Sequence, residues 1–320
     1  MKQKLIQTQA KEIFTRTKLP GCDWVINQYV GCEHNCSYCY ARFMARWKGY
    51  GDWGTWVEAK MNAPELVKNR LISGRVFMSS VSDAYQPIEK ELKLTRRILE
   101  NLDKKTNLSI LTKSDLVLRD IDILRNFENA EVGFTINSFA GKEEELFEPD
   151  SSTNEERIEA MKILKKNGIK TFAFVSPIIP GLVGSHAMPC HSDRLPAKDE
   201  QPSALRLRLE ERNPLAKKQR DNRNNFNTKG FLHSSLRDVS RNDNETLLNI
   251  IEETRGYADY YWFEVINLRG AGKEFSKILE TNYPKSYEIV SNKQSFANRI
   301  EEMKKIIADS GVKTKGIEVH

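Results

Sequence analysis

Apolar runs of five to seven residues recur along the chain and alternate with longer segments in which polar and apolar residues are mixed. The runs are rich in β-branched and aromatic residues, which favour strands. They predict strands at residues 75–79, 108–112, 131–137, 170–176 and 260–266. Because these runs are apolar at nearly every position, we expect strands that are buried on both faces of a sheet.

The segments between the predicted strands have the features of helices, and we expect helices at residues 92–102, 155–167 and 297–310. The second helix is preceded by Ser152, which can form a Ser-x-x-Glu capping box, and is followed by Gly168, which can end it. A repeated strand–helix order predicts an α/β fold with a parallel sheet, either a barrel or an open sheet. In both architectures functional side chains lie at the carboxyl ends of the strands.

One region interrupts this order. Residues 184–243 are rich in Pro, Asn and Arg, and they contain 12 Lys and Arg against 8 Asp and Glu, in a chain with a formal charge of +6. We expect a largely disordered basic insertion with a short helix at 203–212, between one part of the core at 1–183 and its continuation at 244–320. A solvated loop and a nucleic-acid-binding segment both fit this composition, although few aromatic residues are available to stack on bases.

Composition narrows the class of protein. The chain has 320 residues, of which 39% are hydrophobic, so it can bury a sizeable core. Its first residues lack the apolar core of a secretory signal, and no stretch approaches the roughly 18 apolar residues of a membrane span, so we expect a cytoplasmic protein without a membrane partner. Five cysteines are few for a disulfide framework. In a reducing compartment, a tight group of cysteines is more typical of a metal or redox site.

Three of the five cysteines stand close together in the stretch GCEHNCSYCY. Cys32, Cys36 and Cys39 have the spacing C-x3-C-x2-C, which neither a regular helix nor a strand can bring to one point. We therefore expect a loop around a metal centre, in which Gly31 allows a tight turn. A [4Fe–4S] cluster takes one thiolate per iron, so three cysteines leave one iron open for a substrate or a cofactor.

Zinc is the alternative metal. A structural zinc ion normally has four protein ligands, and the chain offers three candidates for the fourth position: Cys22, His34 and Cys190. Cys190 also lies near His186 and His191 in the insertion, and this group fits a separate zinc site.

The three-cysteine motif, followed by an aromatic residue in a chain of βα units, resembles the radical S-adenosylmethionine (SAM) enzymes. The stretch NQYVGCEHNCSYCYARF is similar to the branch that includes the spore photoproduct lyases, and the similarity runs from about residue 21 to residue 181 and resumes near residue 245. The resemblance implies a partial (β/α)6 TIM-like barrel, with a [4Fe–4S] cluster on the cysteines and SAM on the open iron. It also implies reductive cleavage of SAM to a 5′-deoxyadenosyl radical that abstracts hydrogen from a substrate, with an electron donor such as flavodoxin or ferredoxin.

Polar residues at the expected strand ends are candidates for contacts with SAM. In the stretch SSVSDAYQP, Asp83 has a carboxylate that can accept from the cofactor ammonium, and Ser80 and Ser82 accompany it. The alternative to cofactor binding is that these Ser and Asp residues form a turn that caps the next secondary-structure element. Lys113 in LTKSD corresponds, by the resemblance, to a lysine that contacts the cofactor carboxylate. The same resemblance brings forward Thr135, Asn137 and Arg157, with pairing to neighbouring acids as the alternative for Arg157. Ser176 begins the strand-to-loop turn SPIIPG, whose prolines and glycine can pack near the adenine, and is the last cofactor-binding candidate.

The residues that would act on the substrate are harder to assign. Photoproduct lyases carry a hydrogen-donating cysteine where this chain has Ser80, and an O–H bond is much stronger than an S–H bond. Tyr38 and Tyr40 flank Cys39 as the relay tyrosines of the lyases do, so they are the catalytic candidates, with aromatic packing around the loop as the alternative. The end of the last predicted strand supplies candidate substrate contacts: Glu264, Asn267 and Arg269.

These patterns predict a radical SAM enzyme whose substrate is not identified. DNA lesion repair of the photoproduct lyase kind, with nucleic acid as the partner, is the alternative within this class. A zinc-stabilised nucleic-acid-binding protein is the alternative from another class. The metal that the cysteines bind separates an enzyme from a binding protein.

Overall fold

The structure is a computed structural model that describes residues 4–182 and 236–319. The chain divides into two units, and nearly all described residues belong to the unit formed by Met1–Ser185 and Ser240–His320. The other unit, His186–Val239, lies almost entirely outside the described residues. The expected helix at 203–212 and the Cys190 group fall there. No helix in the described part of the chain is both long and apolar enough to cross a lipid bilayer.

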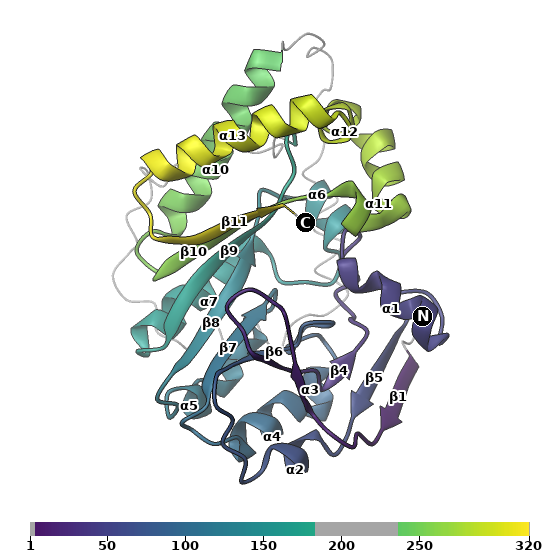
Figure 1. Cartoon of the computed structure of the whole chain (residues 1–320), viewed down its shortest axis with the longest axis vertical. Coiled ribbons are helices and arrows are strands. Elements are labelled where there is room, and N and C mark those ends of the chain that lie inside the picture. The colour runs from purple at the N-terminus through teal and green to yellow at the C-terminus, as the bar shows by residue number, and fades with distance from the viewer. Residues whose placement is uncertain (1–3, 183–235, 320) are drawn as a thin grey trace, which may run out of the picture. The chain divides into compact units, whose positions relative to one another are not determined.

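An eight-stranded sheet is the centre of the first unit (Figure 1). Its order is β11-β10-β9-β8-β7-β6-β3-β2, and every pairing is parallel except the one between β2 and β3. The order does not return from β11 to β2, so the sheet is an open, partial barrel. The strands of this sheet are β2 Phe14–Arg16, β3 Trp24–Ile26, β6 Arg75–Met78, β7 Asn107–Thr112, β8 Ala130–Ile136, β9 Lys170–Ile178, β10 Tyr260–Val265 and β11 Thr314–Val319.

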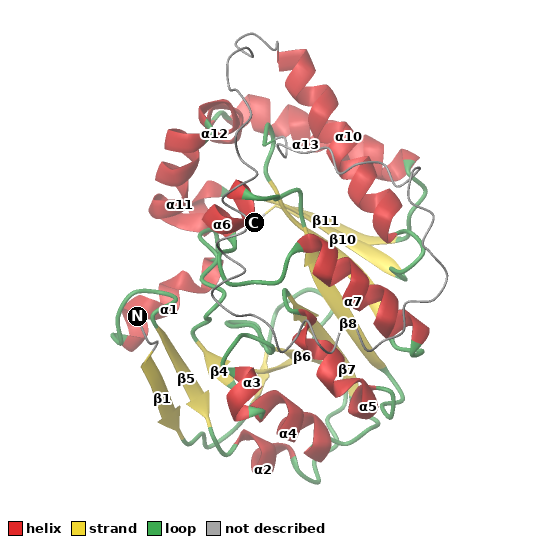
Figure 2. Ribbon diagram, turned by 180° about the vertical axis from the view of Figure 1, so that it is seen from behind, coloured by secondary structure: helices red, strands yellow, loops and turns green. Residues whose placement is uncertain are grey.

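Helical segments connect each parallel strand to its neighbour, and Figure 2 shows α7 against the strands β8 and β9, which it connects. The first half of the unit contains η1 Tyr40–Phe43, α1 Met44–Lys48, α2 Ala63–Val67, α3 Glu89–Leu92, α4 Leu94–Asn101, η2 Asp115–Asp120 and α5 Ile121–Leu124. The second half contains α6 Lys142–Phe147, α7 Asn154–Lys166, α10 Leu236–Thr254, α11 Leu268–Asn282, α12 Pro284–Ser291 and α13 Lys293–Asp309.

A small second sheet has the order β1-β5-β4 and consists of β1 Lys4–Thr8, β5 Trp56–Lys60 and β4 Tyr29–Val30. Strand β4 leads directly into the three-cysteine stretch. Trp56 of β5 is fully buried, and its carbonyl lies against Gly31, so this sheet forms one wall of the cysteine loop.

All five predicted strands are present, with ends that differ from the prediction by at most two residues. Six strands, β3 and β6 to β10, lead into helical segments, which agrees with the expected partial (β/α)6 barrel. The pattern missed β3 because three residues carry too little periodicity. It also missed β11, in which Lys, Gly and Glu interrupt the apolar positions.

The expected helix at 92–102 is α4 Leu94–Asn101, and the one expected at 297–310 begins earlier, at Lys293. Side-chain contacts correct two further predictions. Thr153, and not Ser152, caps α7: its side chain accepts from the Glu156 amide, and the Glu156 carboxylate accepts from the Thr153 amide. The Ser152 hydroxyl is engaged with Asp115 instead. The core also resumes before residue 244, because Asp243 accepts from the Gly181 amide and from Arg299.

The hydrophobic core lies between the sheet and the helices that cover it. Within the sheet, one glycine allows a close contact between two neighbouring strands. Gly133 in β8 faces the ring of Phe172 in β9, and a Cβ at this position would overlap that ring. Phe172 in turn stacks on Tyr260 of β10, with the ring centroids 5.0 Å apart and the planes at 6°. A side chain at position 133 would therefore displace two rings.

Gly133→Ala should lower the free energy of unfolding by about 1 to 3 kcal/mol, the usual cost of overpacking a core. Urea unfolding at equilibrium measures this change. Gly256→Ala is the matched control, since its Cβ would meet no atom within 4 Å. Trimming the ring with Phe172→Leu should recover part of the loss. A Gly133→Ala protein as stable as the wild type would contradict the packing described here.

Candidate active site

The cysteine loop lies at the carboxyl edge of the main sheet and is held by its own backbone and by one buried side chain. The Cys32 carbonyl accepts from the Asn35 amide at 3.3 Å, and the Cys36 carbonyl accepts from the Cys39 amide at 3.2 Å, so two turns follow one another. The fully buried Gln86 amide donates to the Gly31 carbonyl at 3.2 Å and accepts from the Glu33 amide at 2.9 Å. The loop is thus fastened to the segment that follows β6.

Gly31 is required where the loop begins. Its φ is +86°, in the region that favours glycine, and a Cβ there would lie 2.6 Å from the Trp56 carbonyl oxygen. Both the backbone conformation and the available space exclude a side chain. This agrees with the tight turn expected from the sequence.

The three cysteines are free thiols in a largely apolar setting, where Cys32 packs with Ala41 and Trp53. Cys32 is 8% exposed and Cys36 7% exposed, while Cys39 is half-buried. Burial raises the pKa of all three thiols, and it raises that of Cys36 to about 12. A thiolate here needs a compensating positive charge, such as a bound metal centre provides.

The donor set fits an iron–sulfur cluster. Within the described residues, no three His, Cys, Asp or Glu side chains converge on a single metal ion. A [4Fe–4S] cluster does not require such convergence, because each thiolate binds a different iron. Cys22, one candidate for a fourth ligand, lies instead near Arg75 and Lys315 at the amino ends of β6 and β11.

Asp83 and His34 tie the loop to the ends of the strands. The Asp83 carboxylate lies 3.5 Å from His34 Nδ1 and accepts from the Tyr85 amide at 2.8 Å. It also accepts from the Thr112 hydroxyl at 2.7 Å and from the Lys113 amide at 2.8 Å. Burial alone would raise the pKa of Asp83, but His34 and the amide donors lower it from 3.8 to about 2. The carboxylate is thus ionised and fully engaged with the protein.

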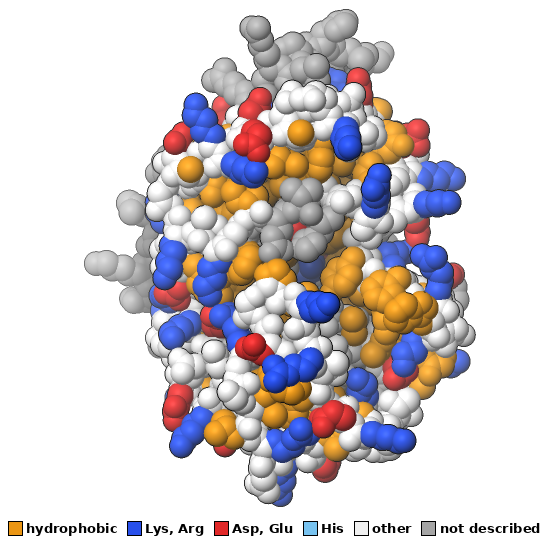
Figure 3. All heavy atoms as spheres, in the orientation of Figure 1, with side chains coloured by type: hydrophobic (Ala, Val, Ile, Leu, Met, Phe, Trp, Pro, Cys, Tyr) orange, Lys and Arg blue, Asp and Glu red, His pale blue; other side chains and the backbone are white. Residues whose placement is uncertain are grey.

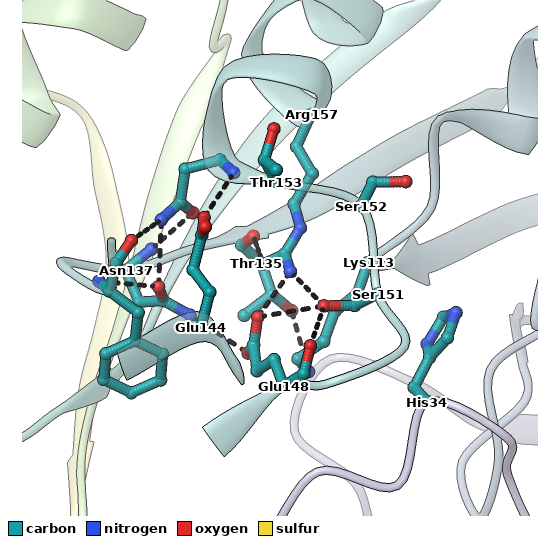
Figure 4. A network of polar contacts seen from close by, with 12 residues as sticks. His34, Lys113, Thr135, Asn137, Glu144, Glu148, Ser151, Ser152, Thr153 and Arg157 are labelled. Carbon is teal, nitrogen blue, oxygen red and sulfur yellow. Dashed lines mark hydrogen bonds and ion pairs between the residues drawn. The ribbon is translucent and has the colours of Figure 1, made fainter. Parts of the chain in front are cut away.

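A second buried carboxylate, Glu148, organises the other side of the loop (Figure 4). It accepts from the Tyr38 hydroxyl, forms an ion pair with Arg157, and accepts from the Asn137 amide at 3.0 Å. Its side chain is only 1% exposed. Burial would raise the pKa of Glu148, but the charges of Arg157 and Lys113 lower it below the ordinary value. The group is therefore an anion in the protein interior.

Lys113 lies between this network and the cysteines. Its ammonium is 3.4 Å from the Thr135 hydroxyl and 5.6 Å from the centroid of the Tyr38 ring. Burial would lower the pKa of Lys113, but the charges of Cys36 and Glu148 raise it above the ordinary value. A half-buried ammonium with so few hydrogen-bond acceptors is well suited to bind an anionic group.

Thr135, Asn137 and Arg157 meet at the end of β8. Arg157 is 1% exposed and donates to the Thr135 carbonyl at 2.9 Å and to the Ser151 hydroxyl at 2.7 Å. The Asn137 side chain also accepts from Asn154 at 3.0 Å and from the Phe139 amide at 3.1 Å. These side chains already have protein partners, so they can shape the site more readily than they can bind a ligand directly.

Ser80 and Tyr40 form a separate contact at the mouth of the site. The Tyr40 hydroxyl donates to the Ser80 carbonyl, and the Ser80 hydroxyl accepts from the Asn27 side chain at 3.0 Å. Ser82 donates to the Tyr29 carbonyl at 3.1 Å. Tyr40 is 53% exposed, whereas the Tyr38 hydroxyl points to a buried carboxylate. The two tyrosines beside Cys39 therefore differ in their surroundings.

The ends of β9 and β10 complete the edge. The Ser176 hydroxyl donates to Glu264, whose charge acts on both Cys39 and Tyr40. Asn267 accepts from the Arg269 amide and thereby caps α11, and the Arg269 side chain is exposed. Of the three candidates for substrate contact, Glu264 has a charge that acts on Cys39 and Tyr40.

An aromatic surface lies next to the cysteine loop on η1 and α1. Trp47 is 78% exposed, and its ring contacts that of Phe43 with the centroids 5.1 Å apart. Figure 3 shows hydrophobic side chains gathered on the surface around α1. Contiguous exposed apolar patches, unlike single exposed residues, often mark a binding surface.

Sequence reasoning missed Glu148 and Gln86, although Gln86 stands in the stretch SSVSDAYQP and Glu148 lies nine residues before the candidate Arg157. Glu148 lies in FEPDSSTNEERIEA, beside Phe147 and Pro149, and a single acidic residue there carries no signal that it will be buried. The indication that was available is Arg157: an arginine in the first turn of an amphipathic helix often pairs with an acid nearby.

A parallel α/β sheet with a three-cysteine loop at its carboxyl edge defines an enzyme of the iron–sulfur type. Residues 26–187 match the Radical SAM superfamily. Because that match covers half of the chain, the chain belongs to the radical SAM superfamily. Membership implies a [4Fe–4S] cluster and SAM as cofactors.

Known proteins are similar to this chain over different shares of its length. An uncharacterized protein of Methanocaldococcus jannaschii is 44% identical over 319 residues, which is 100% of this chain and 99% of that protein. The Radical SAM Nalpha-GlyT isomerase of Pseudomonas phage M6 is 24% identical over 157 residues, which is 48% of this chain and 32% of that protein. Spore photoproduct lyase complexed with dinucleoside spore photoproduct aligns with a TM-score of 0.56 and 15% identity, covering 99% of this chain and 82% of the lyase. At this identity the likeness shows the fold alone.

Asp83→Asn should lower the free energy of unfolding at pH 7 by about 2 kcal/mol, since one pKa unit corresponds to about 1.4 kcal/mol. The pKa of Asp83 is lowered in the folded protein, so its stabilisation is present above pH 4 and is lost as the pH falls toward 2. Urea unfolding of the cluster-free protein between pH 7 and pH 2 should show the two stabilities converging. Asp52→Asn, at an exposed residue, is the control. A difference that does not depend on pH would contradict this account.

Proposed function

We propose that this radical SAM enzyme binds a [4Fe–4S] cluster through Cys32, Cys36 and Cys39 and uses SAM to abstract hydrogen from a substrate. The observation that supports this most is the cysteine loop at the carboxyl edge of the sheet, with Lys113 beside Cys36 and Cys39. The bound cluster and SAM would supply reductive cleavage of SAM to a 5′-deoxyadenosyl radical, with electrons from a donor such as flavodoxin or ferredoxin.

The cofactor side of the proposed site is formed by Lys113 and the residues that hold it. Its ammonium offers a positive charge to the carboxylate of SAM, and Thr135 and the Asp83 contact with its backbone fix its position. Asp83 already accepts hydrogen bonds from three groups, so one of these donors must give way if Asp83 also binds the cofactor ammonium. Ser82 retains lone pairs on its hydroxyl and can accept from that ammonium directly.

The substrate side is formed by Tyr40, Ser80 and Glu264, which lie next to Cys39. Ser176 anchors Glu264 from β9. Tyr40 and Trp47 present aromatic surfaces that are open to solvent, and such surfaces can stack on nucleobases. A nucleic acid is therefore the substrate class that these residues favour.

Substitution of each cysteine tests the cluster assignment. Wild-type protein reconstituted without oxygen should hold about four irons per chain, and Cys32→Ala, Cys36→Ala and Cys39→Ala should each lose most of this iron. Cys22→Ala is the matched control and should keep it, because Cys22 lies at the other end of the sheet. Metal analysis, and electron paramagnetic resonance of the reduced protein with and without SAM, measure the outcome.

Wild-type protein should also show a changed cluster signal when SAM is added and should release 5′-deoxyadenosine on reduction. If the wild-type protein instead holds only zinc and never cleaves SAM, the proposal fails. That result would favour the zinc-stabilised nucleic-acid-binding protein.

DNA lesion repair of the photoproduct lyase kind is the second candidate. The supporting observation is the contact between the Tyr40 hydroxyl and Ser80, which stands where the lyases, by sequence resemblance, carry their hydrogen-donating cysteine. Serine cannot take over that donation because its O–H bond is too strong. A reaction on such a lesion would therefore need a different hydrogen source in this protein.

Incubation of the reconstituted enzyme with dinucleoside spore photoproduct tests the lesion directly. We expect little repaired thymine from the wild type, and at least a tenfold higher yield from Ser80→Cys, which restores an S–H donor. Chromatography of the products measures the yield, and Ser73→Cys, an exposed position at the amino end of β6, is the control. If Ser80→Cys repairs no more than the wild type, the lesion is not a substrate of this site.

A further inference from the structure

The buried charges behind the cysteine loop are unequal in number. Glu148 and Arg157 form an ion pair whose side chains are 1% and 2% exposed, and Lys113 adds a second cation nearby. All three side chains lie beside the cysteine loop: Glu148 accepts from Tyr38, which stands between Cys36 and Cys39, Arg157 pairs with Glu148, and the Lys113 ammonium is 5.6 Å from the centroid of the Tyr38 ring. Because Glu148 offsets Arg157, the net charge that faces the loop from this side is about that of Lys113 alone.

The position of Glu148 is fixed from several directions. Asn137 after β8, Ser151 before α7 and Arg157 donate to its carboxylate (Figure 4). Tyr38 of the cysteine loop is a further donor. The Ser37 amide next to Tyr38 also donates to the Phe147 carbonyl at 3.0 Å. The carboxylate therefore cannot move away from the loop without breaking contacts in three elements.

We propose that Glu148 is a positioning residue that tunes the reduction potential of the cluster through its fixed negative charge; this inference rests on the proposed function. Reduction adds an electron to the cluster, so a nearby anion disfavours the reduced form and a nearby cation favours it. Glu148 cancels the effect of Arg157 and so keeps the potential lower than the two cations alone would set it.

The test is the midpoint potential of the reconstituted full-length protein, followed by electron paramagnetic resonance during a redox titration. Glu148→Gln should raise the potential, and Arg157→Gln should lower it. The expected size is about a tenfold change in the ratio of reduced to oxidised cluster at a fixed potential, which for a one-electron couple is 59 mV. The double variant, Glu148→Gln with Arg157→Gln, should lie close to the wild type.

If the two single variants shift the midpoint potential in opposite directions and the double variant restores it, the effect comes from charge. A purely structural effect would shift the potential in the same direction in both single variants, because each disrupts the same ion pair. Each single variant leaves one buried charge without its partner, which is costly, whereas the double variant leaves none. If a single variant does not load iron, the double variant and Glu148→Asp replace it. Both should keep the potential of the wild type, and a tenfold change in either would overturn the proposal.

The chain contains a matched control at the opposite end of the sheet. Glu131 in β8 accepts from the Tyr260 hydroxyl at 2.5 Å and pairs with Arg75, so it has the same kinds of partner as Glu148. Glu131→Gln and Arg75→Gln should leave the potential unchanged.

A cluster-loaded Glu148→Gln protein with the potential of the wild type would overturn this inference and leave the proposed function standing. A wild-type protein that binds no cluster would instead refute the proposed function itself.

Discussion

A buried carboxylate must have its charge and its lone pairs satisfied, and the candidate site depends on how Asp83 meets this constraint. Its partners come from the cysteine loop, from the turn after β6 and from the end of β7. Because one side chain joins three segments that are distant in sequence, the loop cannot shift independently of the sheet. The backbone of Lys113 is held by the same carboxylate, so the cation and the thiols keep a fixed relation to each other.

The charge and lone pairs of the buried Glu148 carboxylate are also satisfied, but its hydrogen-bond donors are side chains, whereas those of Asp83 include backbone amides. Its donors include the Arg157 guanidinium, the Tyr38 phenol and the Asn137 side-chain amide, so a positive charge and a phenol lie beside it. Asp83 therefore fixes geometry, while Glu148 also fixes the balance of charge. The proposed function requires both, since the thiolates would have to keep their spacing and a bound cluster would have to be reducible inside a protein interior of low dielectric constant.

The sequence was sufficient to predict the long strands and the cysteine loop, because both have local signals: apolar runs, a fixed cysteine spacing and Gly31. It was insufficient for β3, which is only three residues long, and for the choice of Thr153 over Ser152 as the cap of α7. Ser152 has the right chemistry for a cap, but it is engaged by Asp115, which is 37 residues earlier in the chain. Glu148 and Gln86 were missed for the same reason: their partners are set by tertiary contacts and not by neighbours in sequence.

The two tyrosines beside Cys39 look equivalent in the sequence but not in the structure. Tyr38 donates to the buried Glu148 carboxylate and packs between Phe139 and Phe275. If Tyr38 released its hydrogen, Glu148 would lose a hydrogen-bond donor in the protein interior, where water cannot replace it. Tyr40 is 53% exposed, and its acceptor is the Ser80 carbonyl, which water can reach. If a tyrosine takes part in hydrogen transfer to a substrate, energetics favour Tyr40, and Tyr38 belongs with Glu148 to the frame that holds the cysteine loop.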